Sequence, residues 1–404
     1  METNAFASQG QALSRRSRED SMRAKIKVAF IVNNAATWDS LHTVYMRMVQ
    51  KESGFVPRVF VIPCDHASIG QYGGEDTTYT EMLKLGVRTV HPKRKTMGEF
   101  LDVIKAFAPD YVFRQAPWEN HLPPEFRVWN LDFARLCYIP YGFLSANIEH
   151  EQFNQAYHRA CWGIFCETRL HRLLYEKNSP LGSRNVVVTG FPKFETLWER
   201  RSEQFWPTTT RSGDIKIIWA PHHSVTPQWL GFSTFVDNHM LFYNLARSNP
   251  HLHIVLRPHP ALFAKLRAHG VPQEHIDKFI ADFTALPNAA LYEDGDFIPL
   301  FGASDILITD GIGFFSEYML TGKPIIHTDS GRSVGFNPAG ELLTPGLYRA
   351  QNFDEAISTL VHLAKGHDPL HETRLAIAKI LFDPHRIPPS KLIVNILSDA
   401  MQEN

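Results

Sequence analysis

Arg257 and His259 are the residues whose types and spacing most directly indicate chemistry. They alternate with Pro258 and Pro260 in the segment HIVLRPHPALF, directly after an apolar run that predicts a buried strand. Each proline fixes its own φ angle and favours extended geometry in the residue before it, so the corner is stiff. A guanidinium can bond two phosphate oxygens, and an imidazole can donate to the same group or carry a proton. We therefore predict an anion-binding corner; a proline-rich strand exit with two surface cations is the alternative.

The segment SDILITDGIGFFSEYMLTGKPII (304–326) is a second candidate for phosphate binding. A predicted strand ends at Asp310, and Gly311 and Gly313 then lead into a helix. Small residues there let a phosphate approach the backbone N–H groups at the positive end of the helix dipole. Glu317, on the first turns of that helix, is placed to accept hydrogen bonds from ribose hydroxyls. An ordinary strand–turn–helix unit with glycines for tightness is the alternative.

Histidines are the candidates for proton transfer. His222 and His223 follow a predicted strand in IIWAPHHSV. Paired histidines can bind a metal, but the sequence shows no third ligand at useful spacing, so we predict no metal and no cofactor. A hydroxyl is a weak nucleophile and benefits from a base. The candidates for that base are His222, His259 and His42.

The first half of the chain carries fewer signals of this kind. The segment NNAATWDSLHTVY (33–45) joins a predicted strand end to a helix, with Asp39 or Ser40 as the candidate helix cap. We predict that Asn33, His42 and Tyr141 contact an acceptor. An acidic segment contains Glu293, Asp294 and Asp296. We predict that it covers the nucleobase or the leaving phosphate; a solvated capping loop is the alternative.

The hydrophobic pattern predicts the scaffold that positions these residues. Apolar runs of four to six residues alternate with helical stretches from 27 to 195, which indicates a parallel sheet with helical crossovers. A polar, turn-rich segment interrupts the series, and the pattern restarts at 215. Polar residues follow most strands, and ligands of doubly wound sheets bind beyond the carboxyl ends of the strands. The sequence therefore predicts an α/β fold with two Rossmann-like domains facing a central cleft.

This pattern also predicts the domain boundaries. The expected parts are a flexible tail at 1–24, an N-terminal acceptor domain at 25–197, a linker at 198–214, a C-terminal nucleotide-donor domain at 215–388 and a C-terminal helix at 389–404 that packs back on the first domain.

Composition limits the classes of protein and partner. The 404 residues are 44% hydrophobic, and the net charge of -1 gives no general basic field, so we predict no nucleic-acid partner.

The first 24 residues lack the apolar core of a signal peptide, and no window approaches a membrane span of about 18 apolar residues, which predicts a cytoplasmic protein. Arg15, Arg16 and Arg18 indicate either peripheral contact with an anionic membrane or a solvated tail. The cysteines, predicted to be buried thiols in a reducing compartment, are Cys64, Cys137, Cys161 and Cys166.

Four of these segments together resemble a known family. WAPHHS, RPHP and SDILITDGIG…GKPII, in this order and spacing, resemble the CDP-glycerol glycerophosphotransferase family, and GFPKFE resembles its glycine–proline segment at the domain crossover. The resemblance covers roughly 185 to 330 well and the first half in pattern only. It implies a GT-B fold and transfer of glycerol phosphate from CDP-glycerol, with release of CMP, in the synthesis of teichoic-acid-like or capsular polymers.

The resemblance also implies roles for single residues. Arg257 and His259 would contact the donor pyrophosphate, Asp310 and the glycine turn would lie at the phosphates, and Glu317 would lie near the ribose. Two segments depart from the family pattern: YIPYGF stands where the family has Trp-His-Gly-Thr, and GIG stands where it has Tyr-Ser-Ser. The first departure removes the family's candidate base.

We therefore predict a transferase that moves glycerol phosphate, or a related alditol phosphate, from a CDP-activated donor to a polyol-phosphate or glycan acceptor. Arg257, the helix at 313 and Lys323 would stabilise charge on the phosphates. The alternatives are a GT-B glycosyltransferase that uses a nucleotide sugar and a non-catalytic nucleotide-binding protein. The predicted donor-binding residues are Arg257, His259, Asp310, Gly311, Gly313, Glu317 and Lys323.

Overall fold

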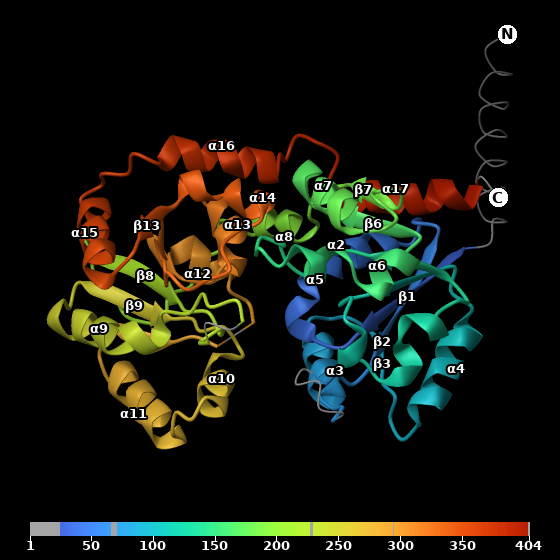
Figure 1. Cartoon of the computed structure of the whole chain (residues 1–404), viewed down its shortest axis with the longest axis horizontal. Coiled ribbons are helices and arrows are strands. Elements are labelled where there is room, and N and C mark those ends of the chain that lie inside the picture. Colours follow the sequence, from blue (N-terminus) through green and yellow to red (C-terminus); the bar gives the residue numbers. More distant parts are fainter. Residues whose placement is uncertain (1–24, 66–70, 227–228, 294, 403–404) are drawn as a thin grey trace, which may run out of the picture.

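The computed structural model describes residues 25–65, 71–226, 229–293 and 295–402. The predicted tail at 1–24, with its arginines, and Asp294 lie outside these ranges. Within them, the chain forms two α/β domains side by side, each with a parallel sheet covered by helices (Figure 1). The prediction of two Rossmann-like domains is confirmed.

The first domain contains a seven-stranded sheet in the order β3-β2-β1-β4-β5-β6-β7. Its apolar strands are buried on both faces, which is typical of a parallel sheet between helical layers. The strands are β1 (Ile26–Val32), β2 (Phe55–Val61), β3 (Thr89–Val90), β4 (Tyr111–Arg114), β5 (Arg135–Tyr138), β6 (Gly163–Cys166) and β7 (Val186–Val188).

The second domain contains a six-stranded sheet in the order β10-β9-β8-β11-β12-β13. Trp219, at the centre of this sheet, stacks on Phe242 with 4.2 Å between ring centroids and fixes α9 against the sheet. The strands are β8 (Ile215–Ala220), β9 (Leu252–Leu256), β10 (Ala289–Leu291), β11 (Ile306–Thr309), β12 (Ile325–Thr328) and β13 (Tyr348–Ala350).

Helices form the crossovers between these strands. Those of the first domain are α2 (Asp39–Met48), α3 (Glu75–Lys84), α4 (Met97–Phe107), α5 (Glu149–Phe153), α6 (Ala156–Ala160), α7 (Arg169–Asn178) and α8 (Lys193–Glu199). Those that follow are α9 (Phe235–Ser248), α10 (Leu262–Ala268), α11 (Gln273–Thr284), α12 (Ile298–Ala303), α13 (Gly313–Met319), α14 (Pro338–Glu341), α15 (Phe353–Ala364), α16 (His371–Leu381) and α17 (Pro389–Gln402). Short 3-10 turns lie at Ala35–Thr37, Glu119–His121, Pro124–Phe126, Val128–Asn130 and Thr344–Gly346.

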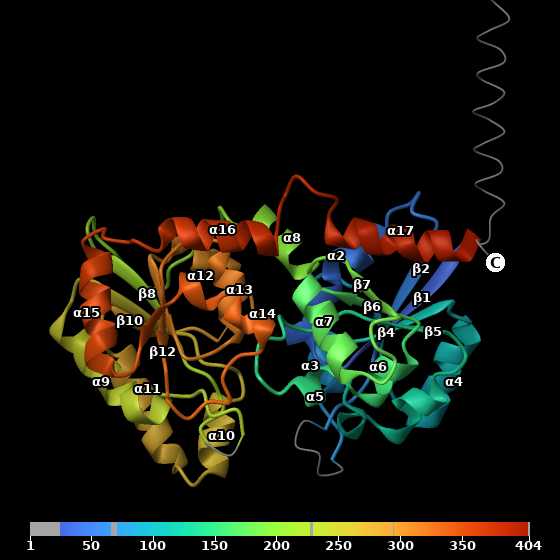
Figure 2. The ribbon, with the colours of Figure 1, turned by 45° about the horizontal axis from the view of Figure 1, so that its top comes forward.

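The last helix, α17, lies on the first domain rather than on the second. Figure 2 shows α16 along the second domain and α17 continuing across the first, beside α2. The hydroxyl of Tyr111 donates to the carbonyl of Leu397 at 2.9 Å. Ser390 donates to both carboxylate oxygens of Glu195, through its N–H at 2.6 Å and its hydroxyl at 2.7 Å. The chain therefore crosses between the domains twice.

A backbone seam joins the two domains on another side. Ala146 and Phe336 form an antiparallel bridge. The N–H of Asn337 donates to the carbonyl of Ser145 and the N–H of Asn147 to that of Gly335, both at 3.0 Å. Within the residues that the structure describes, no helix is both long and apolar enough to cross a membrane.

Candidate functional site

Three histidines gather at the carboxyl edge of the second sheet. β8 and β9 are neighbours, and their pairing continues past the strand ends: Arg257 N–H donates to Trp219 at 2.8 Å and His259 N–H to Pro221 at 3.0 Å. The loops that follow the two strands therefore lie side by side. The ring of His223 is 4.2 Å from that of His222 and 3.9 Å from that of His259. This arrangement brings together residues that the sequence separates by more than thirty positions.

Backbone hydrogen bonds fix the tautomers of two of these rings. The N–H of Ser224 donates to Nδ1 of His222 at 3.2 Å, and the N–H of Ala261 donates to Nδ1 of His259 at 3.1 Å. A backbone N–H can only donate, so Nδ1 accepts in both rings and the proton of each neutral ring is on Nε2. His222 and His259 can therefore donate a hydrogen bond, and these contacts do not support the general-base role considered for them above.

The imidazoles are neutral near pH 7. Burial lowers the pKa of His259 to about 3, with further contributions from His223 and Arg257. Burial lowers the pKa of His223 to about 4, and that of His222 falls well below its usual range for the same reason. Within the described ranges, no group of three or more His, Cys, Asp or Glu side chains is arranged to hold a metal ion.

Arg257 links this histidine cluster to the next group of charges. Its side chain follows β9 and is largely buried, with 7% of the residue exposed. Its guanidinium lies 6.0 Å from the centre of the Tyr292 ring. Burial raises the pKa of Glu317 on α13, and the positive charge of Arg257 is among the influences that lower it.

Asp310 anchors the surrounding loops. Its carboxylate accepts from the N–H of His222 at 2.5 Å, from the N–H of Thr234 at 2.5 Å and from the hydroxyl of Thr234 at 2.8 Å. The residue is 1% exposed, and burial raises its pKa to about 7. Both of its oxygens are thus engaged inside the protein, so its contribution is to hold the His222 loop rather than to meet a phosphate itself.

The glycine turn after Asp310 leaves open space. Gly313 begins α13, and a Cβ at this position would meet no atom within 4 Å. Gly311 is tighter, because a Cβ there would lie 3.3 Å from the Thr309 hydroxyl and 3.6 Å from the His222 ring. Packing therefore explains why residue 311 is glycine, whereas the space around Gly313 would accommodate a side chain.

Glu317 is buried in an ion pair that the sequence did not reveal. Its Oε1 lies 2.6 Å from the ammonium of Lys193, which also lies 2.8 Å from Oδ2 of Asp39. Lys193 lies in the GFPKFE segment, and the sequence predicts Asp39 as a candidate helix cap; the sequence predicts neither as a site residue. The sequence could have indicated both residues by their position, because each lies at the start of a helix that follows a strand of the first sheet.

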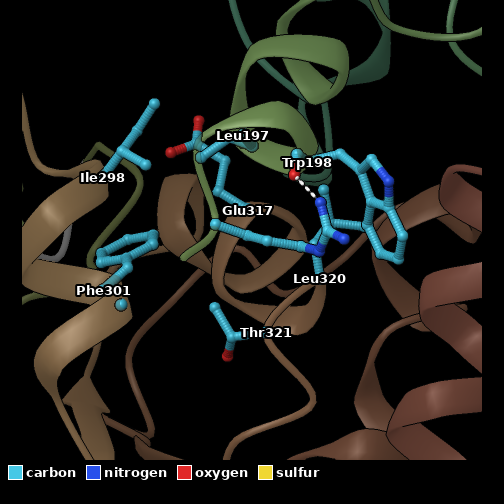
Figure 3. A pocket seen from close by; sticks show the side chains of 9 residues that line it. Leu197, Trp198, Ile298, Phe301, Glu317, Leu320 and Thr321 are labelled. Atoms are coloured by element: carbon cyan, nitrogen blue, oxygen red, sulfur yellow. Dashed lines mark hydrogen bonds between the residues drawn. The ribbon is translucent and has the colours of Figure 1, made fainter. Parts of the chain in front are cut away.

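A small cavity adjoins this ion pair. It has a volume of about 20 Å³ and lies between α8 and helices α12 and α13, lined by Leu197, Ile298, Phe301 and Glu317 among others (Figure 3). This volume suits one water molecule and not a nucleotide. It therefore does not define the ligand site.

The predicted acceptor residues each contact a side chain of the first domain. Asn33 is 8% exposed, and its side chain donates to the sulfur of Cys64 at 3.2 Å, so it is held inside the first domain. Tyr141 packs edge-on against Trp118 with 5.3 Å between ring centroids. His42 accepts at Nδ1 from the indole of Trp38 at 3.1 Å, which places its own proton on Nε2.

Lys323 lies at the opposite edge of the second sheet. It precedes β12, and its ammonium donates to the carbonyls of Phe301 and Gly302, both at 2.8 Å. Burial lowers its pKa to about 8. Because residues at the amino end of a parallel strand are a strand length away from those at the carboxyl end, this position does not support the predicted contact with donor phosphates.

The four cysteines are buried, as predicted. Burial raises the pKa of the Cys64 thiol to about 11 and raises the pKa of the other three thiols as well. The thiolate is the nucleophilic form of cysteine. These side chains are therefore poor nucleophiles and belong to the core.

Comparison with known proteins identifies the fold. No family model and no curated protein matches the chain. Solved structures match it closely in length: a UDP-GlcNAc 2-epimerase of Neisseria meningitidis bound to UDP-GlcNAc has 14% identity and a TM-score of 0.58, over 94% of this chain and 100% of its own. MnaA of S. aureus, solved with UDP, has 13% identity and a TM-score of 0.59, over 93% and 97%.

A third match is the wall teichoic acid polymerase TagF, solved as a histidine-to-alanine variant. It has 12% identity and a TM-score of 0.57, over 99% of this chain and 97% of its own. At these identities the matches show the fold and not the activity. The predicted GT-B architecture is confirmed.

Proposed function

We propose that this protein transfers an alditol phosphate, most simply glycerol phosphate, from a CDP-activated donor to an acceptor hydroxyl. The acceptor oxygen forms a bond to the β-phosphorus, the bond from that phosphorus to the bridging oxygen breaks, and CMP leaves with the electron pair. The hydroxyl proton passes to solvent or to a base. A polyol phosphate or a glycan of a cell-surface polymer is the acceptor in this proposal.

One observation carries the proposal: two imidazoles with Nε2–H fixed by the backbone lie 5.5 Å apart at the carboxyl edge of the second sheet, where Arg257 follows β9. Such donors suit the charge that develops on phosphate oxygens. Phosphoryl transfer through a loose transition state depends mainly on positioning and charge stabilisation. The absence of a histidine from YIPYGF is therefore compatible with catalysis. Among the three histidines, His223 is the one whose tautomer the two backbone hydrogen bonds do not fix.

The choice of donor rests on the motif resemblance and on the similarity to TagF, whose name describes a teichoic acid polymerase. A nucleotide sugar is the second candidate, because two of the similar structures hold UDP-GlcNAc or UDP. Both donors present a pyrophosphate to the same corner. A cytoplasmic protein that contacts the membrane surface would suit either substrate class.

Thermal stabilisation by nucleotides tests the proposal. A ligand that binds only the native state raises the unfolding midpoint with its concentration. We expect CDP-glycerol, CDP and CMP to raise the midpoint more than UDP or GDP at equal concentration. A uridine or guanosine preference would favour sugar transfer. No stabilisation by any of these nucleotides would contradict nucleotide-dependent transfer.

A further inference from the structure

A small hydrophobic core lies at the seam between the domains, beside the histidine cluster. The residues that form it or pack against it are Ala146 and Ile148 of the first domain and Leu230, Phe232, Ile312, Val334 and Phe336 of the second. Ile312 belongs to the glycine turn after Asp310, and Phe232 lies 5.8 Å from the ring of His222. Residues of both domains therefore share one core next to the candidate site.

Asn337 fixes the second-domain side of this core to the first domain. It is 1% exposed. Its Nδ2 donates to the carbonyl of Leu144 at 2.8 Å and to that of Ala146 at 3.2 Å. Its Oδ1 accepts from the N–H of Ala339 at 2.9 Å and from that of Gly340 at 3.0 Å, which caps α14. One side chain therefore joins a helix of the second domain to the backbone of the first.

A series of contacts leads from the neighbouring Phe336 to His222. The ring of Phe336 stacks on that of Phe232, with 6.0 Å between centroids and 28° between the ring planes. The N–H of Phe232 donates to Oγ of Ser224 at 2.9 Å, and this Oγ lies 2.8 Å from Nδ1 of His222. Because Nδ1 also accepts from the N–H of Ser224, it carries no proton, and the hydroxyl must donate to it. His222 is thus oriented by a serine whose oxygen is held by Phe232.

We propose that Phe336 and Asn337 are positioning residues for His222: their contact with the first domain holds Ser224 in place, so that the imidazole presents Nε2–H to a substrate phosphate. A donor that is already oriented needs no reorganisation when charge develops on the phosphate. The inference deepens the proposed function and rests on it for the phosphate contact. The orientation of His222 itself can be measured without a ligand.

The substitution Asn337→Asp breaks the seam with little change in shape. The new side chain keeps the oxygen that caps α14 and replaces only the amide nitrogen, so that a second oxygen faces the carbonyls of Leu144 and Ala146. Asn352→Asp is the matched control. It makes the same change at the N-cap of α15, where Oδ1 accepts from the N–H of Glu355 at 2.9 Å.

The tautomer of His222 is the measurement that separates positioning from a merely structural role. We would record the imidazole nitrogen resonances of the full chain labelled with 15N-histidine, and identify the His222 signals by their loss in His222→Gln. We expect Nε2 to be protonated in the wild type and in Asn352→Asp. In Asn337→Asp, the ratio of the Nδ1–H to the Nε2–H tautomer should rise about five- to tenfold, the effect of weakening one hydrogen bond.

Binding of inorganic pyrophosphate, measured by calorimetry, tests the consequence for the site. We expect its Kd to rise about tenfold in Asn337→Asp and to stay at the wild-type value in Asn352→Asp. A wild type that binds no pyrophosphate contradicts the proposed phosphate contact, whereas the tautomer ratio still decides whether the seam positions His222.

An unchanged tautomer ratio in folded Asn337→Asp overturns the positioning role, and it does so even if pyrophosphate binds to the wild type. If Asn337→Asp does not fold, Phe336→Leu replaces it, because leucine removes the stacking on Phe232 and leaves the backbone bridge to Ala146. The same rise in the tautomer ratio is expected in that variant, and a wild-type ratio there contradicts the inference.

Discussion

At the scale of single residues, hydrogen bonds to the backbone decide what the histidines can do. His222 and His259 each accept at Nδ1 from a following N–H, so each presents Nε2–H. Two donors of fixed orientation need no reorganisation when charge develops on a phosphate. The residue type allowed either a hydrogen-bond donor or a base, and the local loop geometry favours the donor.

Replacement of His259 should therefore reduce turnover strongly. We expect His259→Ala to lower kcat for transfer by about 10²–10³-fold, the usual effect of losing one transition-state donor. His251→Ala is the matched control, because His251 precedes the same strand at its other end and is exposed. Steady-state transfer from the preferred donor is the measurement. Equal kcat values for the two variants would show that the corner does not contact the reacting phosphate.

Glu167 gives a pH-dependent prediction outside the site. It follows β6, is 4% exposed, and burial raises its pKa to about 8. Its neighbour His171, 3.6 Å away, is neutral because burial lowers its pKa to about 3. A raised carboxyl pKa favours folding below the unfolded pKa, and that contribution is lost as the pH rises through about 8.

Glu167→Gln should remove this dependence. Relative to the wild type, we expect the free energy of unfolding of the variant to increase by about 2–3 kcal/mol between pH 6 and pH 9. Urea unfolding at the two pH values is the measurement. A gap between the proteins that is the same at both pH values would mean that the carboxyl titrates normally.

At the scale of elements, the sequence predicts strands well and their partners less well. Apolar runs such as IKIIWA and HIVL are short, β-branched and bounded by prolines, so their strands are clear. The order of the strands brings Arg257 and His222 together, as a doubly wound sheet requires. Lys323 was predicted to contact donor phosphates although it precedes its strand in the sequence, and in the structure its ammonium donates to the carbonyls of Phe301 and Gly302. Lys193 was missed because its partners lie 154 residues before and 124 residues after it.

The C-terminal helix α17 depends on one buried serine. Ser390 donates to Glu195 and accepts from Arg47, so it ties the start of α17 to α8 and α2. Ser390→Ala leaves the buried carboxylate of Glu195 and the partly exposed guanidinium of Arg47 with fewer partners, and we expect a loss of about 1–3 kcal/mol in unfolding free energy. Ser398→Ala, on the same helix but bonded only to exposed Gln402, should change stability by less than about 0.5 kcal/mol. Urea denaturation of the two variants measures this difference in stability. Equal midpoints would mean that α17 docks through its apolar face alone.

At the scale of the whole molecule, the contacts that tie the domains within the described residues include the Lys193 ion pairs, the seam at Ala146 and Phe336, and α17. GT-B proteins act across the cleft between their domains, and closure commonly commits a substrate. A movement of one domain against the other would change the ion pairs of Lys193, because one of its two carboxylate partners belongs to each domain. The start of α2 and the helix α13 are therefore linked through one ammonium.

The return of α17 to the first domain also has a consequence for biosynthesis. The ribosome completes the seven-stranded sheet and α8 by residue 199, yet the helix that covers α2 begins at Pro389. At usual elongation rates of about 5–20 residues per second, the nascent first domain waits roughly 10–40 s for that cover. During this interval an apolar face stays accessible to chaperones, so premature termination within the second domain would leave not one finished domain and one fragment, but two incomplete folds.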